Sequence, residues 1–403
     1  MKKVGIGAAA LITALSIFAM TACDNSGKTT STTAAQQSEA KEDGKSGADF
    51  DGEIVIGGIG PLTGSAAVYG TSVKNGMTMA FDEINANGGV LGKEFKFNFL
   101  DDKGDAQEAT NAYNKLYSDE VTAILGSVTS TPSAAVAELA AQDGIPMLSA
   151  TATALSVTTF GDNIFRVCFT DPFQGKALAE FAAGDDLSAK KVAILYNTSD
   201  DYSSGIADAF EARAKELNME VVAREGYAVG DKDFKAQLNS IMALDPDVLC
   251  APDYYSVDSL IAAQAREIGL DIPILGADGW DGVTTTTDSS NYDSLNNVFF
   301  SNHYTMQDES EKVSKFVNAY REEYNEDPTS FAALGYDAAL LMAEAIEAAG
   351  STDHDKITEQ IAKIQFTGVT GDLRFDKTGD PIKSITMIEI VDGKYVFHSK
   401  VEA

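Results

Sequence analysis

The chain of 403 residues carries 61 acidic and 30 basic side chains, which gives a formal net charge of −31 at pH 7. Such an excess of negative charge repels phosphate backbones and anionic membranes, so the composition argues against a nucleic-acid-binding protein. With 44% hydrophobic residues and a single long apolar run, at the N-terminus, the chain is predicted to form a globular body of two ordinary-sized domains from about Gly52 to Ala403.

The first 23 residues have the layout of a secretory signal peptide. Two lysines follow the first methionine, an apolar stretch covers residues 4–20, and the sequence MTAC ends at Cys23. This ending resembles the lipobox read by lipoprotein signal peptidase, although Met stands where Leu is more usual. We expect Cys23 to become the lipidated N-terminus of an exported protein. An ordinary cleaved signal or a membrane anchor is the alternative, but the apolar run is barely long enough to span a bilayer.

The segment that follows, residues 24–51, is predicted to be a disordered tether. Residues 24–49 consist mainly of Ser, Thr, Gly, Lys, Glu and Gln, with almost no apolar side chain beyond Ala, so they cannot bury enough surface to become ordered. A flexible connection between a lipid and a folded domain has this composition. The lipid would then be the only membrane attachment, on the outer face of the cell membrane, or on the periplasmic side if the cell has two membranes.

From Glu53 onward, strand and helix patterns alternate with little interruption. The first series contains the strand EIVIGGIG, a helix with apolar residues from Val73 to Ile84, the strand EFKFNFLD, a helix over 106–117, the strand VTAILG, a helix over 132–142 and the strand IPMLS. After NIFRVCF, a second series contains KKVAILYN, EVVAREGY, DVLCAP and IPILGA, separated by three helices of which the last covers 257–268. Such alternation predicts an α/β protein with two doubly wound parallel-sheet lobes.

The last hundred residues differ from this pattern. Three helices are predicted over 310–324, 331–349 and 353–364, followed by the strands LRF, SITMIEIV and KYVFH. Helices so late in the chain suggest that it returns to cover the first lobe, with lobe I formed by 52–170 plus 302–380 and lobe II by 171–301 plus 381–403. Several crossings between lobes would form a hinge and a cleft, which suits closure around a small ligand.

Beyond Cys23 the chain has only two cysteines, Cys168 and Cys250, and both lie in apolar, strand-like runs. No spacing of Cys and His resembles a zinc site, so no metal site is predicted. We interpret both cysteines as small buried hydrophobic residues, while a disulfide between them stays open in an exported protein.

The segment GSVTSTPSAAVAEL joins the end of a strand to the start of a helix. Hydroxyl side chains crowd this turn, and Pro132 is placed at the first helical position, where its missing N–H costs nothing. Such a helix N-terminus binds carboxylates through its free N–H groups and its dipole. Ser130 or Thr131 could instead serve only as the helix cap.

Other polar or aromatic residues follow the ends of neighbouring strands. They are the segment SATAT at 149–153, Tyr202, Tyr254 and Asp278. In open α/β sheets, ligands lie outside the carboxyl ends of the strands, so these positions together predict one binding site. Each tyrosine alone could be a packing residue, and Asp278 could be a helix cap.

The motifs carry a specific resemblance. EIVIGGIGPLTGSAAVYG, DEINANGGVLGKEF, LDDKGDAQEATNAYNKL, GSVTSTPS, SATAT and LGADGWD occur in this order. They resemble the leucine/isoleucine/valine-binding family, the substrate-binding components of ABC importers for branched-chain and related amino acids. The resemblance covers essentially all of Gly52 to Ala403. It implies the type I periplasmic-binding-protein fold, in which a three-segment hinge joins two α/β lobes and the ligand lies between them.

The resemblance also implies roles for individual residues. Ser130 takes the position that grips the ligand α-carboxylate, and Thr153 with the backbone of Ala152 forms the next shell. Asp278 takes the position that pairs with the α-ammonium. Tyr202 and Tyr254 take the positions of the second lobe's contacts with the ligand. The pocket for the ligand side chain is formed by Tyr69, Val128 and Phe331, with Trp280 as a further candidate. Phe331 and Trp280 could equally be packing residues of the core.

Two departures from the family pattern affect the identity of the substrate. Gly104 and Thr129 stand where some members carry a disulfide. Asp278 is shorter than the Glu of the branched-chain prototypes, which would move the ammonium or enlarge the site.

Enzymatic function is not expected, because the chain has no nucleophile elbow, no phosphate loop and no His–acid pair at motif spacing. No cofactor is expected either. The resemblance instead implies a binding protein, expected to be a monomer, that captures a free amino acid, branched-chain or otherwise aliphatic, and delivers it to ABC transporter permease subunits. A ligand-sensing receptor domain of the same fold, acting with a separate membrane partner, is the alternative.

Overall fold

A computed structural model describes residues 50–402 of the chain. The predicted signal peptide, the lipobox with Cys23 and residues 24–49 of the predicted tether lie outside the described residues. The last two residues of that tether, Phe50 and Asp51, belong to the folded body, since the Asp51 N–H donates to the Gly92 carbonyl at 2.8 Å.

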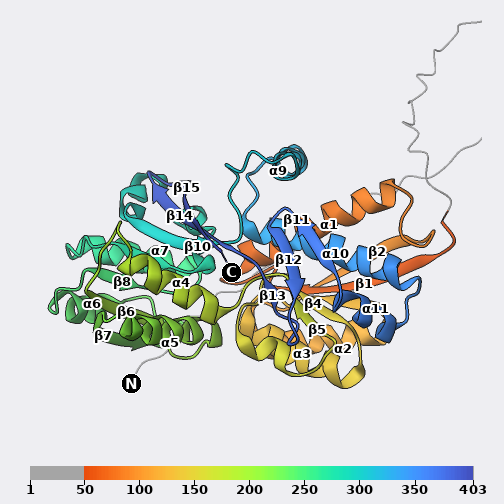
Figure 1. Ribbon diagram of the computed structural model, residues 1–403, viewed down its shortest axis with the longest axis horizontal. Helices are drawn as coiled ribbons and strands as arrows, with labels where there is room; N and C mark the ends of the chain where they lie inside the picture. The colour runs from red at the N-terminus through yellow and green to blue at the C-terminus, as the bar shows by residue number, and fades with distance from the viewer. Residues whose placement is uncertain (1–49, 403) are drawn as a thin grey trace, which may run out of the picture. The chain divides into compact units, whose positions relative to one another are not determined.

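The first sheet is fully parallel, with strand order β2-β1-β3-β4-β5. Its strands are β1 (Glu53–Gly60), β2 (Glu94–Asp101), β3 (Ala123–Leu125), β4 (Met147–Ser149) and β5 (Ile164–Arg166). The connections contain α1 (Ala67–Ala86), α2 (Ala106–Ser118), α3 (Ser130–Asp143) and the 3₁₀ helix η1 (Leu155–Thr159). This is the first predicted β-α series, and it forms the core of one lobe (Figure 1).

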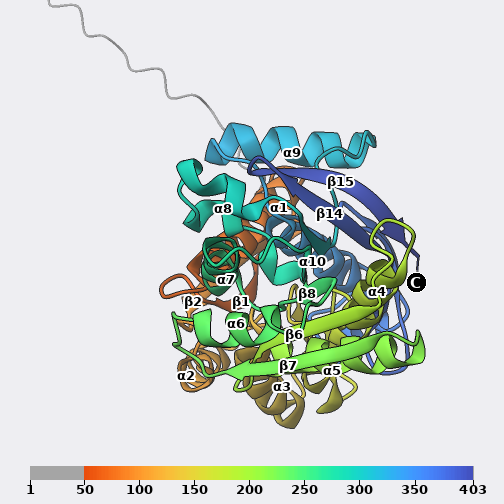
Figure 2. The same ribbon diagram turned by 90° about the vertical axis from the view of Figure 1, so that its left-hand side faces the viewer.

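The second sheet has the order β15-β14-β10-β9-β8-β6-β7. Its parallel strands are β6 (Lys191–Asn197), β7 (Glu220–Tyr227), β8 (Val248–Cys250), β9 (Ile274–Gly276) and β10 (Val298–Asn302). Helix α4 (Asp171–Ala183) precedes these strands. Between them lie α5 (Asp201–Glu216), α6 (Lys235–Met242), α7 (Tyr255–Glu267), η2 (Asp278–Trp280), α8 (Val283–Thr286) and η3 (Ser289–Leu295). Figure 2 faces this second lobe, with β7 at one edge of the sheet.

The opposite edge of the second sheet is antiparallel. There β14 (Ile385–Val391) pairs with β10, and β15 (Lys394–Val401) pairs with β14. A separate small antiparallel sheet contains β11 (Gln365–Gly368), β12 (Gly371–Phe375) and β13 (Pro381–Ile382). The sequence patterns indicated β12, β14 and β15, but they indicated neither β10, β11 and β13 nor this pairing.

The late helices are α9 (Glu311–Tyr324), α10 (Ser330–Ala349) and α11 (His354–Ile361). Ser310 and Asp353, predicted as first helical residues, are instead N-caps whose side chains accept hydrogen bonds from backbone N–H groups of the first turn. Helix α10 packs closely along α1 of lobe I, because a Cβ added at Gly335 would lie 2.4 Å from the Val73 carbonyl oxygen. The chain thus returns to the first lobe, as the sequence predicts.

Three segments cross between the lobes. The first connects β5 to the second sheet, the second leaves β10 for α9 and α10, and the third joins β13 to β14. The fold is therefore α/β, with two doubly wound lobes and a three-segment hinge.

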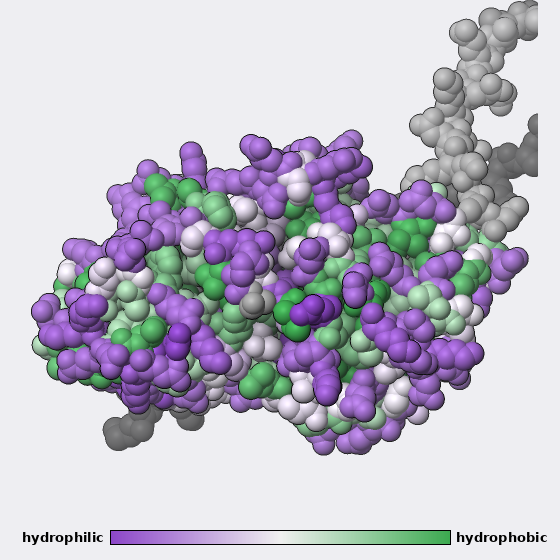
Figure 3. Space-filling view, in the orientation of Figure 1, coloured by the Kyte–Doolittle hydropathy of each residue, from purple (hydrophilic) through white to green (hydrophobic). Residues whose placement is uncertain are grey.

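Most of the face shown in Figure 3 is covered by hydrophilic side chains, with hydrophobic ones in small patches. Cys168 and Cys250 are buried and not bonded to each other. Among residues 50–402, no helix has both the length and the apolar character needed to cross a membrane.

Candidate functional site

A small cavity lies where the carboxyl ends of strands from both lobes face each other. It is lined by Val128, Thr129, Ser130, Thr151, Thr153, Tyr202, Tyr254, Asp278, Gly279 and Phe331. Its volume is about 10 Å³, room for about one water molecule, so a larger ligand fits only when the walls move apart. Seven of the nine predicted site residues therefore lie around one cavity; Tyr69 and Ala152 do not line it.

Larger hollows exist elsewhere in the described chain, including one of about 930 Å³ beside the hinge. We place the site in the small cavity because polar groups from strand ends and helix N-termini converge there, as the general rule for open α/β sheets requires. Its small volume reflects the close contact between the lobes.

The loop after β3 supplies the lobe I side of the cavity. Helix α3 begins at Ser130, two residues before the predicted start at Pro132, so neither Ser130 nor Thr131 is the N-cap. The N-cap is Thr129, whose Oγ1 is buried and has no hydrogen-bond partner among the described residues. The first backbone N–H groups of a helix have no partner within the helix, so this turn presents unpaired donors to the cavity.

The segment after β4 completes this side. Thr151 Oγ1 donates to the Val128 carbonyl at 2.7 Å, which ties the two loops together. The Ala152 N–H donates to Ser149 Oγ at 3.1 Å, and the Ala152 carbonyl accepts from Arg166 Nη1 at 2.8 Å. Because both backbone groups of Ala152 are engaged, the structure leaves Thr151 and Thr153, rather than Ala152, on the cavity wall.

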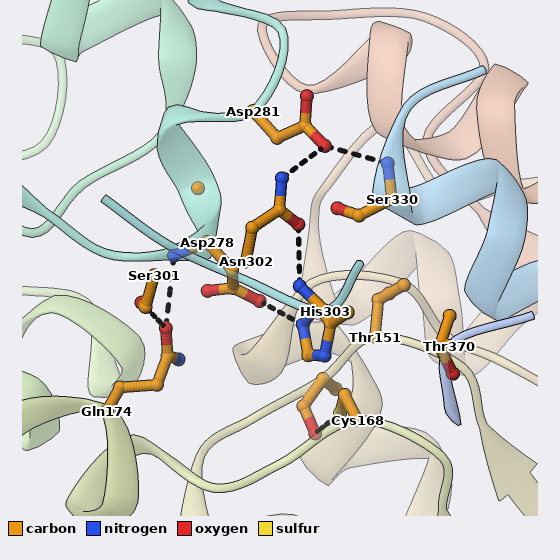
Figure 4. A network of polar contacts seen from close by, with 12 residues as sticks. Thr151, Cys168, Gln174, Asp278, Asp281, Ser301, Asn302, His303, Ser330 and Thr370 are labelled. Carbon is orange, nitrogen blue, oxygen red and sulfur yellow. Dashed lines mark hydrogen bonds and ion pairs between the residues drawn. The ribbon is translucent and has the colours of Figure 1, made fainter. Parts of the chain in front are cut away.

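Asp278 is the carboxylate on the lobe II side, directly after β9, and it is 2% exposed. Its Oδ1 accepts a hydrogen bond from the Tyr202 hydroxyl at 2.9 Å, and its Oδ2 lies 3.0 Å from His303 Nε2. Its backbone N–H donates to Gln174 Oε1 at 3.0 Å (Figure 4). Tyr202 is itself placed by α5, because the N-cap Asp200 accepts from the Tyr202 N–H.

The surroundings of Asp278 are rich in buried acids. Burial raises the pKa of Asp171 and of Asp258 well above its ordinary value, and it raises the pKa of Asp253 to about 7. Burial also lowers the pKa of His303 to about 4, so this imidazole is neutral at pH 7. Within residues 50–402, no lysine or arginine forms an ion pair with Asp278. The Asp278 side chain is thus held by neutral donors, and no cationic side chain of the described residues pairs with it.

Aromatic rings form the rest of the wall. The Tyr202 and Tyr254 rings are stacked, with centroids 4.9 Å apart and an interplanar angle of 7°. Phe331 stacks on Tyr69 with centroids 4.1 Å apart, so Tyr69 stands behind the cavity wall rather than in it. Trp280 is fully buried and donates from Nε1 to the Ala251 carbonyl at 2.8 Å, which makes it a core residue of lobe II.

Tyr69 also joins the two lobes. It lies on α1 of lobe I, and its hydroxyl donates to the Gly279 carbonyl and accepts from the Tyr255 N–H at 2.9 Å. Both partners belong to lobe II. The Tyr255 hydroxyl in turn accepts from the Val68 N–H at 3.4 Å. In the described arrangement the two lobes are therefore in direct contact beside the cavity.

Removing the Tyr69 hydroxyl should weaken closure. In Tyr69→Phe, the Gly279 carbonyl and the Tyr255 N–H lose a partner on closing, which costs about 1–3 kcal/mol. We expect ligand affinity to fall about tenfold, measured by calorimetry, with the unfolding temperature of the ligand-free protein nearly unchanged. Tyr117→Phe, at a half-exposed tyrosine on α2, is the matched control. Equal affinities of Tyr69→Phe and the control would contradict the role.

Three lining residues were not among the predicted site residues: Thr129, Thr151 and Gly279. Each is adjacent in sequence to a predicted site residue, and this adjacency is the signal by which they could have been found. At Gly279 a Cβ would lie 2.3 Å from the Asp253 carbonyl oxygen and 2.7 Å from the Tyr202 hydroxyl, so only glycine fits there.

No group of acids, cysteines and histidines in residues 50–402 has the arrangement of a metal site.

Comparisons with known proteins agree with this geometry. A family model described as a periplasmic binding protein matches residues 53–394. A Leu/Ile/Val-binding protein of Rhizobium johnstonii is 32% identical over 335 residues, which cover 80% of this chain and 89% of the relative. The structure of a leucine binding protein from Thermotoga maritima matches with a TM-score of 0.80 and 35% identity, over 87% of this chain and 99% of the other. A branched-chain amino acid transporter substrate binding protein from Streptococcus pneumoniae, solved with isoleucine, has the same TM-score and identity, over 86% and 98%.

Proposed function

The chain belongs to the periplasmic binding protein family, and we propose that it captures a free amino acid between its two lobes and delivers it to an ABC importer. One observation carries the proposal: Asp278 is buried at the cavity, held by neutral donors and without a cationic partner among the described residues. An α-ammonium group supplies that missing charge, and a buried carboxylate without a counter-charge would otherwise cost stability.

The opposite wall suits the α-carboxylate. Ser130 and Thr129 present hydroxyl groups at the N-terminus of α3, whose unpaired N–H groups and dipole favour a negative charge. Ser130 Oγ accepts from the Ala154 N–H at 3.3 Å, so its hydroxyl proton is free to donate. Thr153 also lines the cavity and is proposed to belong to the next shell around these two groups. The two charged ends of the ligand thus bind opposite lobes.

The ligand side chain faces an apolar wall. Val128 and Phe331 from lobe I and Tyr254 from lobe II line the cavity, with Tyr69 behind Phe331. An uncharged, aliphatic side chain such as that of Leu, Ile or Val suits these contacts. The relatives named for leucine, isoleucine and valine support the same substrate class.

Binding is proposed to close the lobes, with lobe I as 52–170 plus 302–380 and lobe II as 171–301 plus 381–403. Since each lobe contributes groups to the cavity, a ligand that touches all of them favours the closed state. We also propose that the protein acts as a monomer outside the cell membrane, anchored through a lipid on Cys23. Catalysis is not part of the proposal, because Ser130 Oγ contacts a backbone N–H rather than a base.

Calorimetric titration with the natural amino acids tests the function. Leucine, isoleucine or valine should bind tightly at one site per chain, and binding should raise the unfolding temperature. A protein that binds none of the natural amino acids, and is folded by circular dichroism, would refute the proposal.

A further inference from the structure

His303 occupies a special position relative to the site. It directly follows β10, where the second crossing segment leaves lobe II, and its side chain is fully buried. Its Nε2 lies 3.0 Å from Asp278 Oδ2, although 25 residues separate the two in sequence. The sequence patterns gave no role to this histidine.

The ring of His303 is held firmly in this orientation. It stacks on Phe169, with centroids 3.7 Å apart and an interplanar angle of 16°. Phe169 lies between β5 and α4, on the first crossing segment. The His303 backbone N–H donates to Asn302 Oδ1 at 2.7 Å (Figure 4). Two hinge segments therefore fix one imidazole against the carboxylate of the site.

The bonding pattern determines which nitrogen carries the proton. An ionised carboxylate only accepts hydrogen bonds, and a neutral imidazole has one N–H, so a carboxylate that pairs with the ligand ammonium requires the proton on Nε2. His303 Nδ1 is buried and has no hydrogen-bond partner among the described residues. The bond to Asp278 is thus the one polar contact that the ring makes in residues 50–402.

We propose that His303 is a positioning residue for recognition of the ligand ammonium group, an inference that rests on the proposed function. Its Nε2–H holds Asp278 Oδ2 while the Tyr202 hydroxyl holds Oδ1, so the carboxylate plane is fixed. Each oxygen keeps a further lone pair for the ammonium. The short side chain of Asp278 is in this way held in position to bind the ammonium group of the ligand.

The test separates positioning from structural support by changing the ligand as well as the residue. His303→Leu removes the donor, and His303→Gln keeps an N–H donor that can reach Asp278. Each variant is titrated with L-leucine and with 4-methylpentanoate, which is leucine without its ammonium group. Cys250→Ala, a buried change in β8 without contact to Asp278, is the control for a general loss of stability.

We expect His303→Leu to bind leucine about ten- to a hundredfold more weakly, the loss typical of a hydrogen bond to a charged group, and 4-methylpentanoate within about twofold of wild type. His303→Gln should recover most of the leucine affinity, and Cys250→Ala should leave the ratio of the two affinities unchanged. Unchanged leucine affinity in His303→Leu, or an equal loss for both ligands, would overturn the inference.

A measurement on the wild-type protein covers the case in which His303→Leu does not fold. The chain has three histidines, so ¹⁵N-histidine labelling gives a simple spectrum. A neutral ring protonated on Nε2 in the leucine-bound protein supports the inference, and a proton on Nδ1 overturns it. Failure of the proposed function is seen separately, since the wild type would then bind no amino acid at all.

Discussion

Asp278→Ala should weaken leucine binding by about a hundredfold or more, because the ligand ammonium would lose its charged partner in a dehydrated cavity. The carboxylate is 2% exposed, and the donors that hold it, Tyr202 and His303, are neutral. Truncating one member of such a charge-assisted pair typically costs about 2–5 kcal/mol. Calorimetry on the purified variant measures the effect directly.

Asp337→Asn is the matched control for this experiment. Asp337 is also fully buried, but it lies on α10 and accepts hydrogen bonds from the Val369 and Thr370 N–H groups. This control should lower the unfolding temperature and leave leucine affinity nearly unchanged. If Asp278→Ala keeps wild-type affinity, the acid at the ammonium position has been wrongly assigned.

Amino acids with charged side chains should bind at least about a thousandfold more weakly than leucine. The apolar wall of Val128, Phe331 and Tyr254 offers no partner for a second charge, and burying an unpaired charge costs several kcal/mol. Competition of arginine and glutamate against bound leucine measures the difference, with isoleucine as the positive control.

Asp281, in the loop after Asp278, and Tyr255, at the start of α7, are the two side chains near the site that would have to supply such a partner. Asp281 Oδ2 accepts from the Ser330 N–H at 2.7 Å and from Asn302 Nδ2 at 3.2 Å, and Tyr255 contacts Val68; neither lines the cavity. Neither side chain therefore places a charge in the wall formed by Val128, Phe331 and Tyr254. Tighter binding of arginine or glutamate than of leucine would show that these side chains rearrange and that the pocket is charged.

Much of the fold followed from local patterns. Alternating strands and helices predicted the two lobes, and polar residues directly after strands, such as Asp278, predicted where the cavity lies. This worked because the carboxyl ends of parallel strands meet at one edge of the sheet. Helix starts were less accurate: α3 begins at Ser130 rather than Pro132, since a proline is tolerated anywhere in the first turn, where N–H groups are unpaired.

Contacts between distant segments could not be predicted from local patterns. The antiparallel pairing of β14 with β10 depends on which sheet edge is free, and no sequence motif records it. The bond between His303 and Asp278 and the link from Tyr69 to Gly279 depend on the relative placement of hinge and lobes. Such residues are buried tyrosines and histidines, which sequence alone does not distinguish from ordinary core residues.

Small-angle X-ray scattering with and without ligand tests the central claim, that an amino acid is bound between two lobes which close on it. The radius of gyration should fall when ligand-free protein is saturated with leucine, and it should stay constant with an equal concentration of glutamate. The same radius of gyration in both states, for protein that calorimetry shows to be saturated with leucine, would contradict closure.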